Sequence, residues 1–131
     1  MKIITLLACL CLSVWSCDPA RRIQMYNQTS GDAEVVWMIK EDSIHSSPLF
    51  LSNSKTTVFS LKDDARKISL SCGIGAWNPA AVRNLADDLD SLVIRWGERE
   101  IRLASTDSIS NYLMSRRRGA DNAKIRIVLK D

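Results

Sequence analysis

Residues 92 to 103 read Leu92-Val93-Ile94-Arg95-Trp96-Gly97-Glu98-Arg99-Glu100-Ile101-Arg102-Leu103. Two segments with alternating apolar residues flank the dipeptide Gly97-Glu98, and a two-residue turn that starts with glycine is typical of a type II′ β-hairpin. Such a turn fixes the register, so that apolar pairs share one face of the hairpin and an ion pair lies on the other. The predicted pairs are Ile94 with Ile101, Leu92 with Leu103, and Arg95 with Glu100.

Short apolar segments on both sides of this hairpin predict further strands. They are β-branched or alternate with polar residues, as strands of a half-buried sheet do. The continuous run from Val35 to Ile39 predicts a strand that is buried on both faces. A brief apolar stretch, Leu49-Phe50-Leu51, is a candidate edge strand. The other predicted strands cover residues 23–26, 56–61, 67–72 and 125–129.

Two helices are expected between these strands. Asn78 can cap the first helix with its side chain. Pro79 would then occupy the first helical position, where its missing N–H costs no hydrogen bond. The second is expected to start near Thr106 or Asp107 and to end at the basic triplet 116–118, before Gly119. One face of the first helix, which is predicted to run to about Asp90, carries Val82, Leu85, Leu89 and Leu92.

The arrangement of these elements predicts a mainly β fold. About seven short strands with two inserted helices are typical of a β-sandwich-like, mostly antiparallel architecture, and an α+β fold is the alternative. The chain has 131 residues, of which 115 follow the N-terminal segment described next. This length suffices for one domain, and we expect a single β-rich domain over residues 17–131.

The N-terminus has the features of a secretory signal peptide. Met1-Lys2 is followed by an apolar run from Ile3 to Val14, and the chain turns polar after Cys17. That run is too short to span a bilayer, which takes about 20 apolar residues. The expected signal peptide therefore covers residues 1–16.

The segment Val14-Trp15-Ser16-Cys17 resembles the lipobox of bacterial lipoproteins, in which a cysteine is acylated and becomes the mature N-terminus. Ser16 and Val14 fit that pattern, whereas Trp15 departs from it, because that position usually holds a small residue. The resemblance implies lipidation of Cys17 and attachment of the chain to a membrane of the cell envelope. An ordinary cleaved signal peptide and an uncleaved anchor are the alternatives.

The remaining chain is similar, more loosely, to small lipoproteins of Gram-negative gut bacteria that carry one β-rich module behind the lipid. This similarity rests on the strand expected from Arg21 to Asn27, almost directly after Cys17. It implies no activity.

The cysteines do not form a disulfide framework under this interpretation. Cys9 and Cys11 lie in the signal peptide, and an acylated Cys17 has no free thiol, so Cys72 is alone. We expect Cys72 to be a small buried residue that alternates with Ile68 and Leu70 on one strand face. Without lipidation, a Cys17–Cys72 bridge is conceivable.

The charge and the motifs exclude several functions. The formal charge of +3 falls to +2 when Lys2 leaves with the signal peptide, so the basic field that nucleic-acid binding requires is missing. The segment Gly73-Ile74-Gly75 lacks the rest of a phosphate-binding loop. The acids at 87, 88 and 90 lack the spacing of a calcium loop. We therefore expect no nucleic-acid partner, no cofactor and no metal.

Two tryptophans are the candidate binding residues. Trp77 in the glycine loop and Trp96 at the hairpin turn can be partly exposed, and exposed aromatic rings stack on sugars or anchor protein partners. The main hypothesis is a non-enzymatic binding module for a protein or glycan. One alternative is a small hydrolase or thiol enzyme that uses Cys72 or His45, although no catalytic signature surrounds either residue. A purely structural envelope component is the other alternative.

Overall fold

The computed structural model describes residues 18–49 and 54–131. Within them, eight strands form two four-stranded sheets, so the fold is mainly β, as the sequence predicts. Sheet A has the order β4-β1-β8-β7, in which β1 and β8 run parallel and the other neighbours are antiparallel. Its strands are β1 (Ala20–Asn27), β4 (Lys67–Ile74), β7 (Arg117–Arg118) and β8 (Lys124–Leu129).

Sheet B is antiparallel throughout and has the order β3-β2-β5-β6. The register predicted for the hairpin of β5 and β6 is confirmed, and Gly97 has the positive φ of 56° that a type II′ turn requires at that position. The strands of this sheet are β2 (Ala33–Ile39), β3 (Thr56–Leu61), β5 (Leu89–Trp96) and β6 (Arg99–Leu103).

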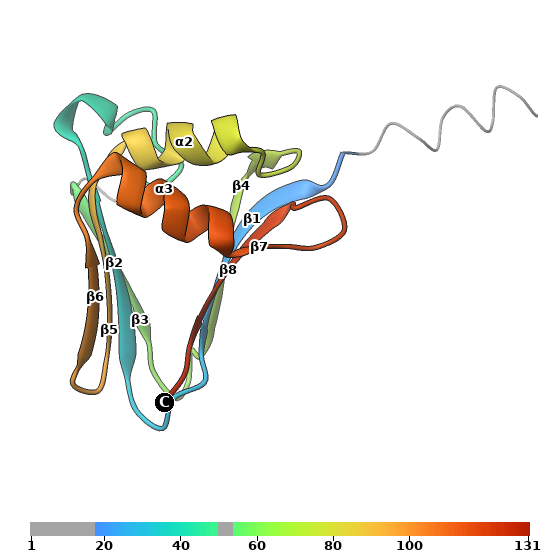
Figure 1. The fold of residues 1–131 in the computed structure, drawn as a ribbon. Helices are drawn as coiled ribbons and strands as arrows, with labels where there is room; N and C mark the ends of the chain where they lie inside the picture. Colours follow the sequence, from blue (N-terminus) through green and yellow to red (C-terminus); the bar gives the residue numbers. More distant parts are fainter. Residues whose placement is uncertain (1–17, 50–53) are drawn as a thin grey trace, which may run out of the picture.

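Two α-helices fill one end of the molecule. The two sheets lie close together near the C-terminus and diverge toward α2 (Pro79–Asp87) and α3 (Thr106–Ser115), which pack in the wide end of this wedge (Figure 1). Asn78 caps α2 by accepting a hydrogen bond from the Ala81 N–H over 2.8 Å. Ser105 and Ser108 cap α3 reciprocally. A short 3-10 turn, η1 (Glu41–Ser43), follows β2.

One hydrophobic core joins both sheets and both helices. Ile23 and Met25 of β1 are fully buried, as are Trp37 of β2 and Ile109 of α3. Buried residues alternate along β3 and β8, because successive side chains of a strand point to opposite faces, whereas β1 and β2 each contain three consecutive buried residues. The inner faces of the two sheets and the helices therefore bury one another.

Two local expectations are wrong, and a third is right in part. Helix α2 ends at Asp87, and Leu89 and Leu92 already belong to β5, whose apolar residues extend the helical spacing by coincidence. Met38 is 39% exposed, so β2 is not buried on both of its faces along its whole length. The expected end of α3 is right in part. Arg116 is the C-cap residue of the helix, and the side chains of Arg117 and Arg118 donate to the carbonyl oxygens of Met114 and Ser115. The backbone of Arg117 and Arg118, however, forms β7.

Some expectations concern residues outside the described ranges. They are the signal peptide over residues 1–16, the acylation of Cys17, and most of the candidate edge strand at 49–51. Leu49 itself is buried. Neither helix in the described part of the chain combines the length and the apolar character needed to cross a membrane.

Candidate functional site

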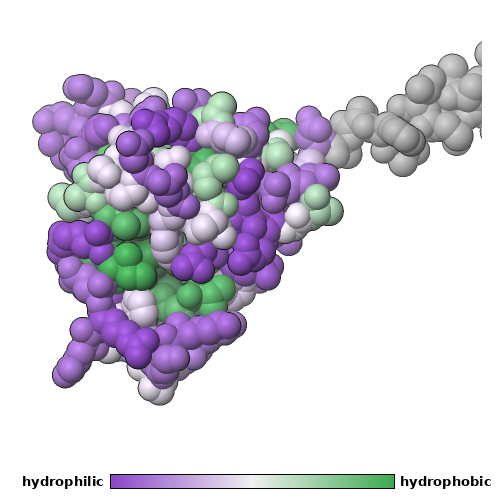
Figure 2. All heavy atoms as spheres, viewed as in Figure 1, coloured by the Kyte–Doolittle hydropathy of each residue, from purple (hydrophilic) through white to green (hydrophobic). Residues whose placement is uncertain are grey.

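A groove of about 470 Å³ opens between the two sheets, below α3. Figure 2 shows apolar side chains gathered in the gap between the sheets and framed by hydrophilic ones. We call this the inter-sheet groove. It is lined by Ile94, Trp96, Ile101, Tyr112, Arg116, Arg118, Arg126, Val128, Leu129 and Lys130.

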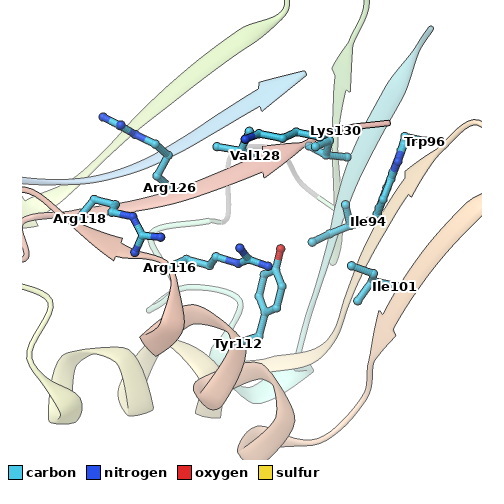
Figure 3. Close-up of a pocket in the computed structure, with 10 residues that line it drawn as sticks. Ile94, Trp96, Ile101, Tyr112, Arg116, Arg118, Arg126, Val128 and Lys130 are labelled. Carbon is cyan, nitrogen blue, oxygen red and sulfur yellow. The ribbon is translucent and has the colours of Figure 1, made fainter. Parts of the chain in front are cut away.

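The groove exists because sheet A ends early on this side. Strand β7 has only two residues and pairs with the first two residues of β8, so the rest of β8 has no neighbouring strand on this edge. On the opposite side, the hairpin of β5 and β6 contributes Ile94, Ile101 and Trp96. Helix α3 supplies Tyr112 from its last turn. Figure 3 shows these side chains around the opening, with Trp96 and Ile101 on one side and Arg118 on the other.

The polar part of the lining is cationic. Arg116, Arg118, Arg126 and Lys130 all border the groove, and no Asp or Glu among the described residues does so. The Arg116 guanidinium lies 4.8 Å from the centroid of the Tyr112 ring, as a cation–π pair. Arg118 donates to the carbonyl oxygens of Ser115 and Arg117. These contacts orient the cations but do not neutralise them.

Several donors at the groove have no acceptor. The Nε atoms of Arg116 and Arg126 and the Nε1 atom of Trp96 are buried, and no acceptor in the described chain reaches them. Buried donors without a partner are rare and costly in proteins. Burial also raises the pKa of Tyr112, and the nearby Arg116 opposes this rise. The groove therefore offers donors and positive charge to an acceptor-rich, anionic molecule.

The two candidate tryptophans differ in their environment. Trp96 is half-buried and lines the groove. The expected exposure of Trp77 is wrong, because its side chain is only 2% exposed. Its Nε1–H donates to the Arg22 carbonyl oxygen over 2.9 Å, and the Arg21 guanidinium covers its ring at 5.0 Å. Trp77 thus binds the glycine loop to β1. The two residues are far apart in sequence, so the local sequence pattern does not predict their contact.

Cys72 lines a separate cavity of about 330 Å³ that includes Arg21, Ser46 and Asp88. It is a free thiol. Burial raises the pKa of this thiol to about 11, although the positive charge of Arg21 opposes the shift. His45 is exposed and is not among the residues that line this cavity. The described structure therefore holds Cys72 as a neutral thiol and does not bring His45 to its cavity.

No group of three or more metal-binding side chains occurs within residues 18–49 and 54–131. The sequence alone does not identify the groove arginines as residues of this site. The available signal is the basic triplet 116–118 together with the alternating cations 124, 126 and 130 of the last strand. Sequence spacing alone does not show that these segments meet beside Trp96.

Comparisons of the chain with protein-family models, with characterised proteins and with solved structures find no match.

Proposed function

We propose that the folded part of this chain is a non-enzymatic binding module that takes an anionic ligand in the inter-sheet groove. One observation carries the proposal: four cations, and no Asp or Glu among the described residues, line an aromatic and apolar groove that also contains unpaired buried donors. Desolvated arginine favours carboxylate, sulfate or phosphate groups, because its planar fork binds two oxygens at once.

The aromatic residues narrow the ligand class to an acidic glycan. Trp96 and Tyr112 present ring surfaces beside the cations, and aromatic rings pack well against the apolar faces of sugars. An acidic sugar would place its ring near Trp96 and its charged group near Arg116. A glycan ligand agrees with the expected location at the cell envelope, where the chain is proposed to be held by acyl groups on Cys17.

The state of Cys72 supports binding rather than catalysis. A nucleophilic cysteine needs a lowered pKa, usually from a neighbouring base or positive field. The pKa of Cys72 moves the opposite way because the thiol is buried. Neither Cys72 nor His45 lines the inter-sheet groove.

The proposal is tested with a panel of oligosaccharides that carry uronic acid, sulfate or phosphate groups, beside their neutral counterparts. Binding is measured by calorimetry and by tryptophan fluorescence. We expect at least one acidic sugar to bind and the neutral ones to bind poorly. Arg116→Gln should weaken binding about 10- to 100-fold, because hydrogen bonds to a charged group contribute about 1.5–3 kcal/mol.

The matched control is Lys40→Gln, which removes a cation that does not line the groove. It should leave affinity within about twofold, since Lys40 does not contact the groove and salt weakens the interaction between separated charges. Equal binding of neutral and acidic sugars, or full affinity of Arg116→Gln, would contradict the proposed site. Circular dichroism verifies that each variant is folded.

A further inference from the structure

Positive charge is segregated between the two sheets. The strands of sheet A carry seven Lys and Arg residues and no Asp or Glu. The strands of sheet B carry three of each kind. The net charge of the chain is small, so this asymmetry appears only when the residues are assigned to their sheets.

The cations of sheet A lie mainly on its outer face. Ile23 of β1 and Ile125 of β8 point into the core, so their neighbours Arg22 and Lys124 point outward. The pairing of β7 with β8 places Arg118 beside Lys124. Arg22, Lys124 and Arg118 therefore form a row across three adjacent strands, and the row meets the inter-sheet groove at Arg118. The acids nearest to this row in sequence, Asp18 and Asp121, lie outside the strands.

A row of like charges has a cost in stability. Side chains directly opposite each other on neighbouring strands interact, and like charges in such positions destabilise a sheet. Sheet B avoids this cost, because Arg95 pairs with Glu34 and Glu100, each at 2.9 Å. The residues of the row in sheet A have no ion pair among the described residues. An external anionic partner would remove the repulsion.

The same face carries an aromatic residue suited to an interface. Tyr26 lies between Lys67 and Arg126, whose charged groups are 5.2 and 5.4 Å from its ring centroid. Lys67 is directly opposite Tyr26 on β4. Cationic side chains with long apolar stems, grouped around a tyrosine, suit the region of lipid headgroups, where tyrosine is enriched.

We propose that the outer face of sheet A lies against an anionic lipid surface. The orientation of sheet A toward the membrane rests on the proposed acylation of Cys17. Strand β1 begins at Ala20, only three residues after that cysteine, so an anchored chain would hold the row of cations next to the headgroups. Juxtamembrane cations attract anionic lipids and need not be arranged for a specific headgroup. The outer face of sheet A presents several such cations side by side toward the lipid surface.

The test uses vesicles of phosphatidylcholine, alone or mixed with phosphatidylglycerol. Every variant of the full chain carries Cys17→Ala, so that no acyl group contributes and the N-terminal apolar run is common to all. The test variant combines Arg22→Gln, Lys67→Gln and Lys124→Gln, none of which lines the groove. The control combines Lys40→Gln, Lys62→Gln and Arg99→Gln, which removes the same charge elsewhere.

We expect binding to depend on phosphatidylglycerol and to weaken as salt is added. Each cation near an anionic surface corresponds to about a fivefold change in binding, so the test variant should bind about 100-fold more weakly. The control should retain most of the affinity. Removing the like charge should also raise the midpoint of thermal unfolding of Lys124→Gln in solution, a readout that needs no vesicle.

Equal losses in the two triple variants would overturn the inference, because net charge alone would then explain binding. Binding to a soluble polyanion such as heparin without binding to the mixed vesicles would also overturn it. The outcome is separate from that of the groove. Failure of sugar binding with preserved vesicle binding would remove the proposed function and leave the lipid face standing.

Discussion

At the scale of single residues, the ionisation of Cys72 distinguishes a binding module from a thiol enzyme. The folded pKa of about 11 lies above the ordinary value of 9.0, because burial disfavours the thiolate. By linkage, Cys72 therefore contributes stability that is complete below about pH 9 and is lost as the pH rises toward 11. The raised pKa keeps the thiolate a minor form at physiological pH and so disfavours nucleophilic reaction.

This predicts slow alkylation of Cys72 in the folded protein. At pH 8, iodoacetamide should modify it about 100-fold more slowly than in the urea-unfolded chain, because two pKa units separate the states. Peptide-resolved mass spectrometry measures this thiol apart from the other cysteines. Arg21→Gln should slow the reaction further, since it removes the charge that favours the thiolate. Rapid modification of the folded protein at pH 8 would restore the enzyme alternative.

The two tryptophans show which single-residue environments the sequence does not reveal. Each lies within two residues of a glycine in an expected turn or loop, a setting that favours exposure of both side chains. Trp96 is half-buried, because it lines the open inter-sheet groove. Trp77 is buried, because β1 comes from far away in sequence to accept its N–H and to place Arg21 over its ring. Only long-range pairing decides between them.

At the scale of elements, the hairpin of β5 and β6 is specified locally. Gly97 has a φ of 56°, and a Cβ built there meets nothing within 4 Å. A side chain would therefore be disfavoured only by the left-handed backbone conformation, not by a clash. The turn and the alternation of the flanking residues both favour the same register.

Gly97→Ala should accordingly lower the free energy of unfolding by about 1 kcal/mol. Urea denaturation followed by circular dichroism measures the change. Gly31→Ala is the matched control, because Gly31 also has open space around its Cβ position but no positive φ. It should not destabilise the protein. A loss of the same size in both variants would show that the turn conformation of Gly97 is not the cause.

Other elements were predictable only in part. The strands themselves follow from alternation, and α3 from its spacing and its polar start. The end of α2 did not follow, because Leu89 and Leu92 continue the helical spacing into β5. The parallel pairing of β1 with β8 joins opposite ends of the chain, and no local pattern encodes it. The groove depends on that pairing, so the site could not be located from the sequence.

At the scale of the whole molecule, the two surfaces proposed for binding occupy different parts of the wedge. The inter-sheet groove opens between the edges of the sheets, the cationic row faces outward from sheet A, and the two meet at Arg118. Sheet B carries its own neutralising acids. A tether at Cys17 would hold sheet A nearest to the lipid. The hairpin of β5 and β6, which belongs to sheet B, would lie farther from the lipid.

Acylation of Cys17 should therefore be the dominant attachment in cells, with the cationic face as a weaker addition. One acyl chain binds a membrane only marginally, whereas two or more hold firmly. Mass spectrometry of the membrane fraction should find a chain that begins at Cys17 and carries acyl mass. Cys17→Ala should release the protein, Cys72→Ala should not, and the triple glutamine variant of sheet A should stay bound while Cys17 is intact. An unmodified Cys17 in the membrane fraction, or retention of Cys17→Ala, would contradict the tether. Vesicle binding by sheet A would then be the remaining mode of attachment, because it needs no acyl group.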